Sequence, residues 1–89
     1  MARILIVDDS PTETFRFKEI LGKHGFEVIE ASNGADGVTM AQAELPDLVL
    51  MDVVMPGLNG FQATRQIARG ATTKHIPVVI VSTKDQATD

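Results

Sequence analysis

Residues 48–51 form a short apolar run that ends in Asp52, and the turn residues Pro56-Gly57 and Asn59-Gly60 follow it. An apolar run of this length between turn signals is typical of a strand buried on both faces of a parallel sheet. In open α/β sheets, ligands collect outside the carboxyl ends of the strands. The sequence therefore predicts that Asp52 lies at the edge of the sheet where ligands bind.

Two further apolar runs also end in polar residues. Residues 4–7 lead into Asp8 and Asp9, and residues 78–81 lead into Ser82. A weaker strand at residues 27–31 and three helical patterns complete a β-α-β-α-β-α-β order. This alternation indicates an α/β fold with a doubly wound parallel sheet and right-handed crossovers, so the polar strand ends should meet at one edge.

The helices carry recognisable start signals and apolar faces. Ser10 is predicted to cap the first helix, with Pro11 at its first position and Glu13 closing a capping box. Helical spacing predicts that one face of this helix turns toward the sheet, formed by Phe17, Ile20, Leu21 and His24. The same spacing predicts inward faces for the other two helices, formed by Ala35, Val38, Ala41 and Leu45 in the second and by Phe61, Thr64, Ile67 and Ala68 in the third.

Composition limits the classes of protein that the chain can represent. Its 89 residues suffice for one domain, residues 1–89, and no more. The chain has 12 acidic and 8 basic residues without a run of Lys or Arg, which argues against nucleic-acid binding. It has no cysteine, and its first apolar run is too short for a signal peptide or membrane span. We therefore expect a cytoplasmic protein without disulfides or membrane insertion.

Three carboxylates at neighbouring strand ends cannot all stay ionised at close range without a compensating cation. All-oxygen ligation with few protein groups favours Mg²⁺. We expect Asp9 and Asp52 to bind it directly, Asp8 to act through water, and the backbone carbonyl of Val54 to complete the protein ligands. An oxygen of Asp52 is then positioned to attack phosphorus and form an aspartyl phosphate.

The third strand end supplies hydrogen-bond donors for such a phosphoryl group. The Ser82 hydroxyl and the Thr83 backbone N–H are the predicted donors, and inward movement of Ser82 would shift its strand and the adjoining loop. Each residue also has an ordinary structural interpretation: Asp8 and Asp9 as helix-capping residues, Asp52 as a turn former, and Ser82 as a common hydroxyl. Their occurrence at one edge of one alternating pattern favours the functional interpretation.

Three segments carry a resemblance to response-regulator receiver domains of bacterial two-component signalling. They are ILIVDD at residues 4–9, VLMDVVMPGLNG at residues 49–60 and IPVVIVST at residues 76–83. The resemblance implies a flavodoxin-like strand order of 2-1-3-4-5 and a phosphorelay from a histidine kinase or its phosphotransfer domain. It also implies that Asp52 is the phosphoacceptor, Asp8 and Asp9 the acidic pair, and Ser82 the switch hydroxyl. Thr83 stands where the family usually has a small residue.

Two longer segments resemble a narrower group. MDVVMPGLNGFQATRQ and VSTKDQ are similar to the stand-alone receivers of the pilus chemotaxis-like system that governs twitching motility, which implies a downstream motility or pilus protein as partner. The fifth strand with its phosphate-binding lysine, and the last helix, have no counterpart here. We therefore expect a C-terminally truncated receiver whose uncovered sheet edge pairs two copies as a homodimer.

Two other functions compete with a phosphorylated receiver. A non-phosphorylatable interaction module is favoured if the missing lysine disables the chemistry. A phosphatase or phosphotransferase of the haloacid-dehalogenase type would carry a second Asp two residues after the nucleophile, where this chain has Val54. We expect no turnover of an external substrate, so the chain is not predicted to be an enzyme. Exposure to Mg²⁺ and a small phosphodonor distinguishes these alternatives.

Overall fold

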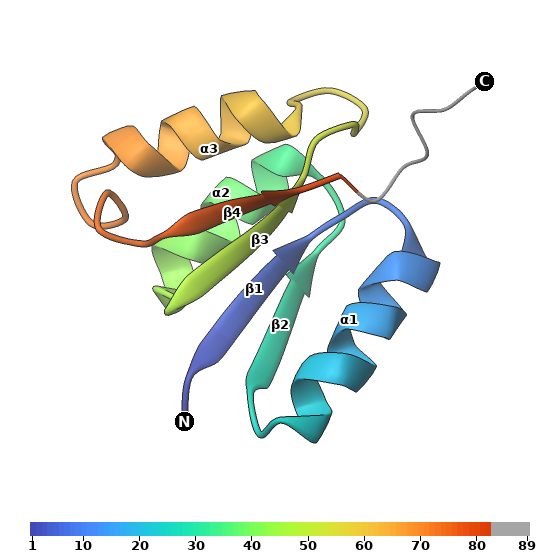
Figure 1. Cartoon of the computed structure of the whole chain (residues 1–89). Helices are drawn as coiled ribbons and strands as arrows, with labels where there is room; N and C mark the ends of the chain where they lie inside the picture. Colours follow the sequence, from blue (N-terminus) through green and yellow to red (C-terminus); the bar gives the residue numbers. More distant parts are fainter. Residues whose placement is uncertain (83–89) are drawn as a thin grey trace.

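The computed structural model describes residues 1–82, in which strands and helices alternate along the chain (Figure 1). The strands pair in parallel in the order β2-β1-β3-β4. This confirms the predicted doubly wound α/β sheet and the part of the strand order that these residues include. The elements are β1 (Arg3–Val7), α1 (Pro11–Lys23), β2 (Glu27–Ala31), α2 (Gly34–Glu44), β3 (Leu48–Asp52), α3 (Gly60–Arg69) and β4 (Val78–Val81).

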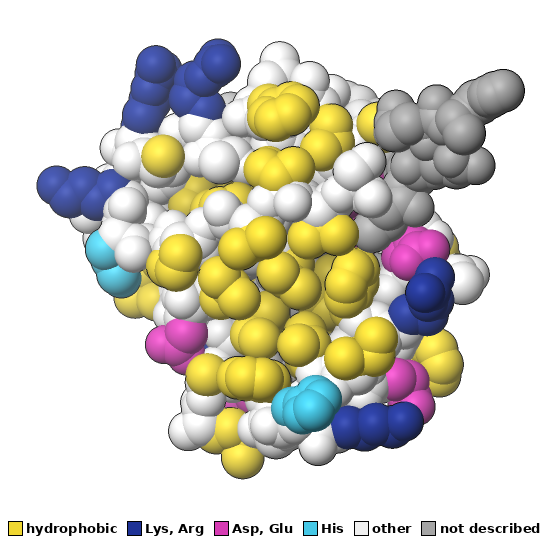
Figure 2. Space-filling view, in the orientation of Figure 1, with side chains coloured by type: hydrophobic (Ala, Val, Ile, Leu, Met, Phe, Trp, Pro, Cys, Tyr) yellow, Lys and Arg dark blue, Asp and Glu magenta, His cyan; other side chains and the backbone are white. Residues whose placement is uncertain are grey.

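Helices cover both faces of the sheet. Helix α1 packs over β1 and β2 on one face, and α2 and α3 pack against each other on the opposite face (Figure 1). Figure 2 looks onto the face that carries α1, where hydrophobic side chains gather over the strands beside that helix. Within residues 1–82, no helix has the length and apolar character needed to cross a membrane.

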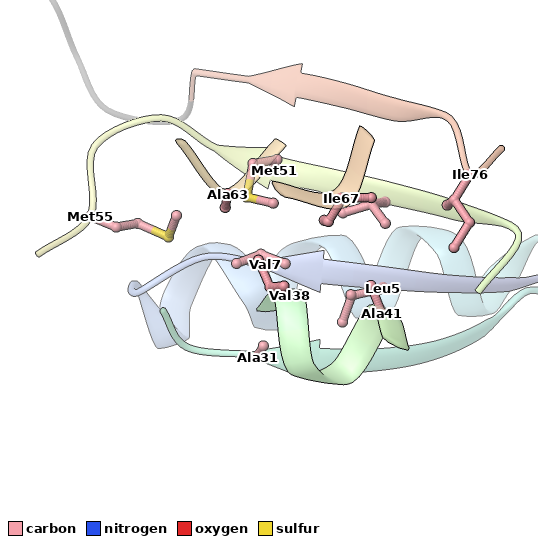
Figure 3. Close-up of a cluster of buried hydrophobic side chains, with 11 residues drawn as sticks. Leu5, Val7, Ala31, Val38, Ala41, Met51, Met55, Ala63, Ile67 and Ile76 are labelled. Atoms are coloured by element: carbon pink, nitrogen blue, oxygen red, sulfur yellow. The ribbon is translucent and has the colours of Figure 1, made fainter. Parts of the chain in front are cut away.

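The main core lies between the sheet and the pair α2 and α3 (Figure 3). Val7 and Met51 are register partners on adjacent strands, and both are fully buried, as is Ile67 of α3. Ile4 and Ile6 alternate with this set and are also buried, so β1 is covered on both faces, as expected for a central strand. Burial of each such aliphatic side chain contributes about 1.5–3 kcal/mol to the stability of the folded state. The core thus fixes the two strands that end in acidic residues.

The start of α1 agrees with the sequence prediction in part. Ser10 caps the helix by accepting a hydrogen bond from the Glu13 N–H, and Pro11 occupies the first turn. The predicted capping box is wrong, because the Ser10 N–H donates to Asp8 Oδ1 at 2.8 Å and the Glu13 carboxylate pairs with Arg16. A complete capping box occurs instead at α3, where Asn59 and Gln62 exchange hydrogen bonds, and it was not predicted from the sequence.

Several predicted inward-facing residues are exposed. Ile20 is 53% exposed and Phe61 56% exposed, and His24, Ala35, Leu45 and Ala68 also face solvent. In α1, Phe17 and Leu21 are partly buried and Thr14 is buried, because this helix packs mainly on the β1 and β2 half of the sheet. In α3 the inward line runs through Gly60, Ala63 and Ile67, which turns Phe61 outward. Val38, Ala41 and Ile67 are buried as predicted.

Candidate metal centre

The ends of β1 and β3 bring the predicted acidic residues together. The two strands are parallel neighbours with Val7 opposite Met51, so Asp8 and Asp52 occupy the next position on each strand path. Asp8, Asp9 and Asp52 each offer a carboxylate oxygen, and these oxygens all lie within 4.8 Å of one another. The structure thus forms the cluster that the strand endings predicted, and we call these three residues the acidic cluster.

Burial and backbone hydrogen bonds hold the acidic cluster in place. Asp8 is 4% exposed and Asp52 2% exposed, whereas Asp9 is partly exposed. The Ser10 N–H donates to Asp8 Oδ1 at 2.8 Å, and the Val53 N–H donates to Asp52 Oδ1 at 2.9 Å. Because both donors belong to the turns that follow the strands, the backbone itself orients these two carboxylates.

The donor set of the acidic cluster fits a hard divalent cation. Mg²⁺ binds oxygen at about 2.0–2.1 Å, so ligands on opposite sides of one ion are separated by about 4.2 Å. The observed spread of up to 4.8 Å is close to that limit. Small side-chain rotations, or one bridging water, would complete the coordination. Without a cation, three carboxylates at this range repel one another, and partial burial strengthens the repulsion.

The loop after β3 is held tightly over the site. The Gly60 N–H donates to the Val53 carbonyl at 3.0 Å, and a Cβ at Gly60 would collide with the Asp52 carbonyl oxygen. Only glycine therefore allows α3 to begin this close to the end of β3. Val54 lies in this loop with its side chain 53% exposed, and the role of its carbonyl as a metal ligand remains a prediction.

The third predicted strand end is that of β4, which pairs with β3 next to the acidic cluster. Asp52 pairs with Val81 across β3 and β4, so Ser82 follows directly after the register partner of Asp52. Ser82 is exposed, and its assignment as the switch hydroxyl remains a prediction. Thr83 lies outside the described residues, as does Lys84.

A hollow of about 250 Å³ opens next to Asp8 and Asp9, between β1, α1 and β2. Its other lining residues were not predicted from the sequence. Ser32 follows β2 at the same sheet edge, so the rule that located the acidic residues could also have identified it. The remaining lining residues are Pro11, Thr14, Glu30 and Ala31.

The sequence of the chain is similar to sequences of known proteins. Residues 4–89 match the sequence family described as the response regulator receiver domain. The chain is 65% identical to Protein PilH of Pseudomonas aeruginosa over 89 residues, covering all of this chain and 74% of that protein.

Solved structures give the same result. The N-terminal domain of a response regulator receiver protein from Methanoculleus marisnigri superposes with a TM-score of 0.90 at 33% identity, over 94% of this chain and 68% of that one. A response regulator, TrrA, was solved in complex with the histidine kinase ThkA. A chain of that complex matches with a TM-score of 0.85 at 30% identity, over 100% of this chain and 76% of its own length.

Proposed function

Because this chain belongs to the response regulator receiver domain family, we propose that it accepts a phosphoryl group on Asp52 and signals through that modification. The observation that carries the proposal is the acidic cluster, in which oxygens of three carboxylates lie within 4.8 Å of one another. Asp52 is the cluster member that ends a strand, and its carboxylate is oriented by the Val53 N–H. Such a carboxylate is suited to nucleophilic attack.

Mg²⁺ is the proposed cofactor. Asp9 and Asp52 would hold it directly, Asp8 would act through water, and the Val54 carbonyl would complete the protein ligands. When bound, the ion offsets the negative charge of the carboxylates and of the incoming phosphoryl oxygens. Support comes from the all-oxygen donor set and from the burial of Asp8 and Asp52.

In the proposed transfer, an Asp52 carboxylate oxygen attacks the phosphorus of a phosphohistidine. A P–O bond forms as the P–N bond breaks, the electron pair stays on the imidazole nitrogen, and that nitrogen takes a proton from solvent. The receiver modifies itself and turns over no external substrate. We assign the Ser82 hydroxyl and the Thr83 N–H as donors to the new phosphoryl group, and the position of Ser82 beyond the register partner of Asp52 supports this role.

We propose a histidine kinase, or its phosphotransfer domain, as the phosphodonor. The complex of ThkA with TrrA supports this partner, because TrrA is a response regulator solved with a histidine kinase. The 65% identity with PilH along the whole chain supports the narrower proposal, a receiver of the pilus chemotaxis-like system in twitching motility with a downstream motility or pilus protein. We also retain a homodimer through the edge of β4 as part of the proposal.

The first test is incubation with Mg²⁺ and acetyl phosphate, followed by intact-mass measurement. We expect the mass to increase by one phosphoryl group, and we expect no increase when EDTA removes the metal. Asp52→Asn keeps the shape of the side chain but removes the nucleophilic oxygen, so it should abolish the adduct. Beryllofluoride, which mimics the phosphoryl group, should bind the unmodified protein and not the variant.

Each outcome of this experiment distinguishes between the candidate functions. Phosphorylation that persists in Asp52→Asn would contradict the assignment of the phosphoacceptor. The absence of any adduct with Mg²⁺ and either reagent would favour the alternative function, a non-phosphorylatable interaction module. Glu19→Gln, which removes one acidic charge from the exposed face of α1, is the matched control and should be phosphorylated as efficiently as the unmodified chain.

A further inference from the structure

Charge is distributed unevenly between the two parts of the described chain. Residues 1–52 contain ten Asp and Glu against four Lys and Arg. Residues 53–82 contain no acidic residue and three basic ones, Arg65, Arg69 and Lys74. The chain has a net charge of −4, so this basic part stands out against an acidic background. A localised charge of opposite sign steers partners of complementary charge to one surface.

The basic residues of the two parts also differ in their partners. In the first part, Arg3 pairs with Glu27 and Glu44, Arg16 with Glu13, and Lys18 with Glu30. None of the ion pairs found among residues 1–82 involves Arg65, Arg69 or Lys74. Their charge is therefore not neutralised by neighbouring side chains of the described structure.

Helix α3 presents two of these cations together with an aromatic ring. Phe61, Arg65 and Arg69 follow one another at four-residue spacing, which places them along one side of the helix. All three are exposed, and Phe61 is 56% exposed, whereas Ala63 and Ile67 face the core. Figure 2 shows Lys and Arg side chains gathered over the part of the molecule where Figure 1 places the end of α3 and the loop after it. We call Phe61, Arg65 and Arg69 the α3 stripe.

We propose that the α3 stripe is a docking surface for an acidic helical segment of a partner protein. Two carboxylates one helical turn apart would pair with Arg65 and Arg69, and an apolar side chain one further turn along the partner would pack on Phe61, which precedes Arg65 by four residues. Arginine binds carboxylates in bidentate geometry, and aromatic and arginine residues dominate the binding energy of many protein interfaces. None of the three residues of the α3 stripe belongs to the acidic cluster, so the proposal goes beyond phosphorylation of Asp52.

The same residues suit a protein better than a nucleic acid or an anionic membrane. Phosphate-rich partners require several cations over an extended surface, and binding gains strength with each phosphate contact. The α3 stripe supplies two guanidinium groups, and the rest of the chain is predominantly acidic and repels polyanions. The exposed Phe61 ring favours a partner that also provides an apolar side chain.

The test is titration of the ¹⁵N-labelled chain, followed by amide NMR shifts. The probe is a helical peptide with two glutamates four residues apart and a leucine four residues beyond them on the same side of the helix, and the matched peptide has lysines in place of those glutamates. We expect the acidic peptide to shift resonances of α3 and the lysine peptide to leave them unchanged. Arg65→Glu should weaken binding about tenfold or more, and added salt should also weaken it.

Lys23→Glu is the control variant. Lys23 is exposed at the end of α1, so this substitution reverses one positive charge as Arg65→Glu does, but away from α3. It should change affinity less than about twofold. Equal losses in Arg65→Glu and Lys23→Glu, shifts confined to other elements, or no binding by the acidic peptide would overturn the proposal. Tighter binding to phosphatidylglycerol vesicles or to single-stranded DNA would overturn the assignment to a protein partner.

Phe61→Ala tests the apolar part of the surface. It should weaken binding of the acidic peptide. The Tm of the chain should stay nearly unchanged, because the substituted side chain is exposed. Circular dichroism of each variant verifies that it is folded. Asp52→Asn should bind the peptide as the unmodified chain does, so a failed phosphorylation experiment and a failed docking experiment remain distinguishable.

Discussion

Asp9 is the partly exposed member of the acidic cluster, whereas Asp8 and Asp52 are buried. A substitution at Asp9 therefore changes the charge of the acidic cluster with less disturbance of buried structure than one at Asp8 or Asp52. We predict that Asp9→Asn raises the free energy of unfolding in EDTA by about 1 kcal/mol, because it removes repulsion between like charges. Thermal unfolding of a chain of this size would show this as an increase in Tm of about 4–8 °C.

The same variant should respond less to Mg²⁺. A ligand that binds only the folded state at ten times its Kd stabilises that state by about 1.4 kcal/mol. The unmodified chain should show this gain, and Asp9→Asn should lose most of it because one direct ligand has lost its charge. Glu19→Gln makes an equal change in net charge on α1 and should keep the full response. A variant that is destabilised in EDTA, or that responds fully to Mg²⁺, would contradict a shared cation site.

Among the elements, the junction between β3 and α3 has the strictest steric requirement. A Cβ at Gly60 would meet the backbone of Asp52 and Val53, which cannot move without disturbing the end of β3. We predict that Gly60→Ala lowers the free energy of unfolding by about 2–3 kcal/mol. It should also reduce phosphorylation at Asp52, because the loop over the site must shift. Denaturant unfolding and intact-mass measurement check the two effects.

Gly22 provides the matched control for that substitution. It lies in the last part of α1, and a Cβ there would meet no atom within 4 Å. Gly22→Ala should therefore stabilise the chain by about 0.5–1 kcal/mol, since alanine loses less conformational entropy in a helix. Equal effects of the two substitutions would show that the close approach at Gly60 does not constrain the fold.

The elements that sequence could predict are those determined by local pattern. The apolar strands and their polar endings located Asp8, Asp9 and Asp52 correctly, because parallel strands must end at a common edge. The outward orientation of Ile20 and Phe61 was not predictable in this way. Helical spacing defines a stripe but not how far the sheet extends beneath it, and α1 packs mainly on β1 and β2. The hydrogen bond from Ser10 to Asp8, which replaced the predicted capping box, likewise depends on tertiary placement.

At the scale of the whole molecule, the described residues leave both edges of the sheet unpaired, β2 on one side and β4 on the other. Strand β4 pairs with β3 alone within residues 1–82, and its Val79 and Ile80 are 46% and 36% exposed. Figure 2 shows that hydrophobic side chains also gather over the strands on the face that carries α1. Exposed backbone donors and acceptors along such an edge favour pairing with another strand.

We therefore predict that the 89-residue chain forms a homodimer through β4 and unfolds in one cooperative transition as a single domain. Val79→Lys should shift the population towards monomer, because burying an ammonium group at a strand edge opposes pairing. Phe15→Lys adds the same charge at a side chain that is 63% exposed on α1 and should leave the dimer intact. Light scattering and sedimentation over a range of concentrations measure the populations. A native-like monomer with a sharp thermal transition would contradict the dimer, because the edge of β4 would then be stable without a second copy.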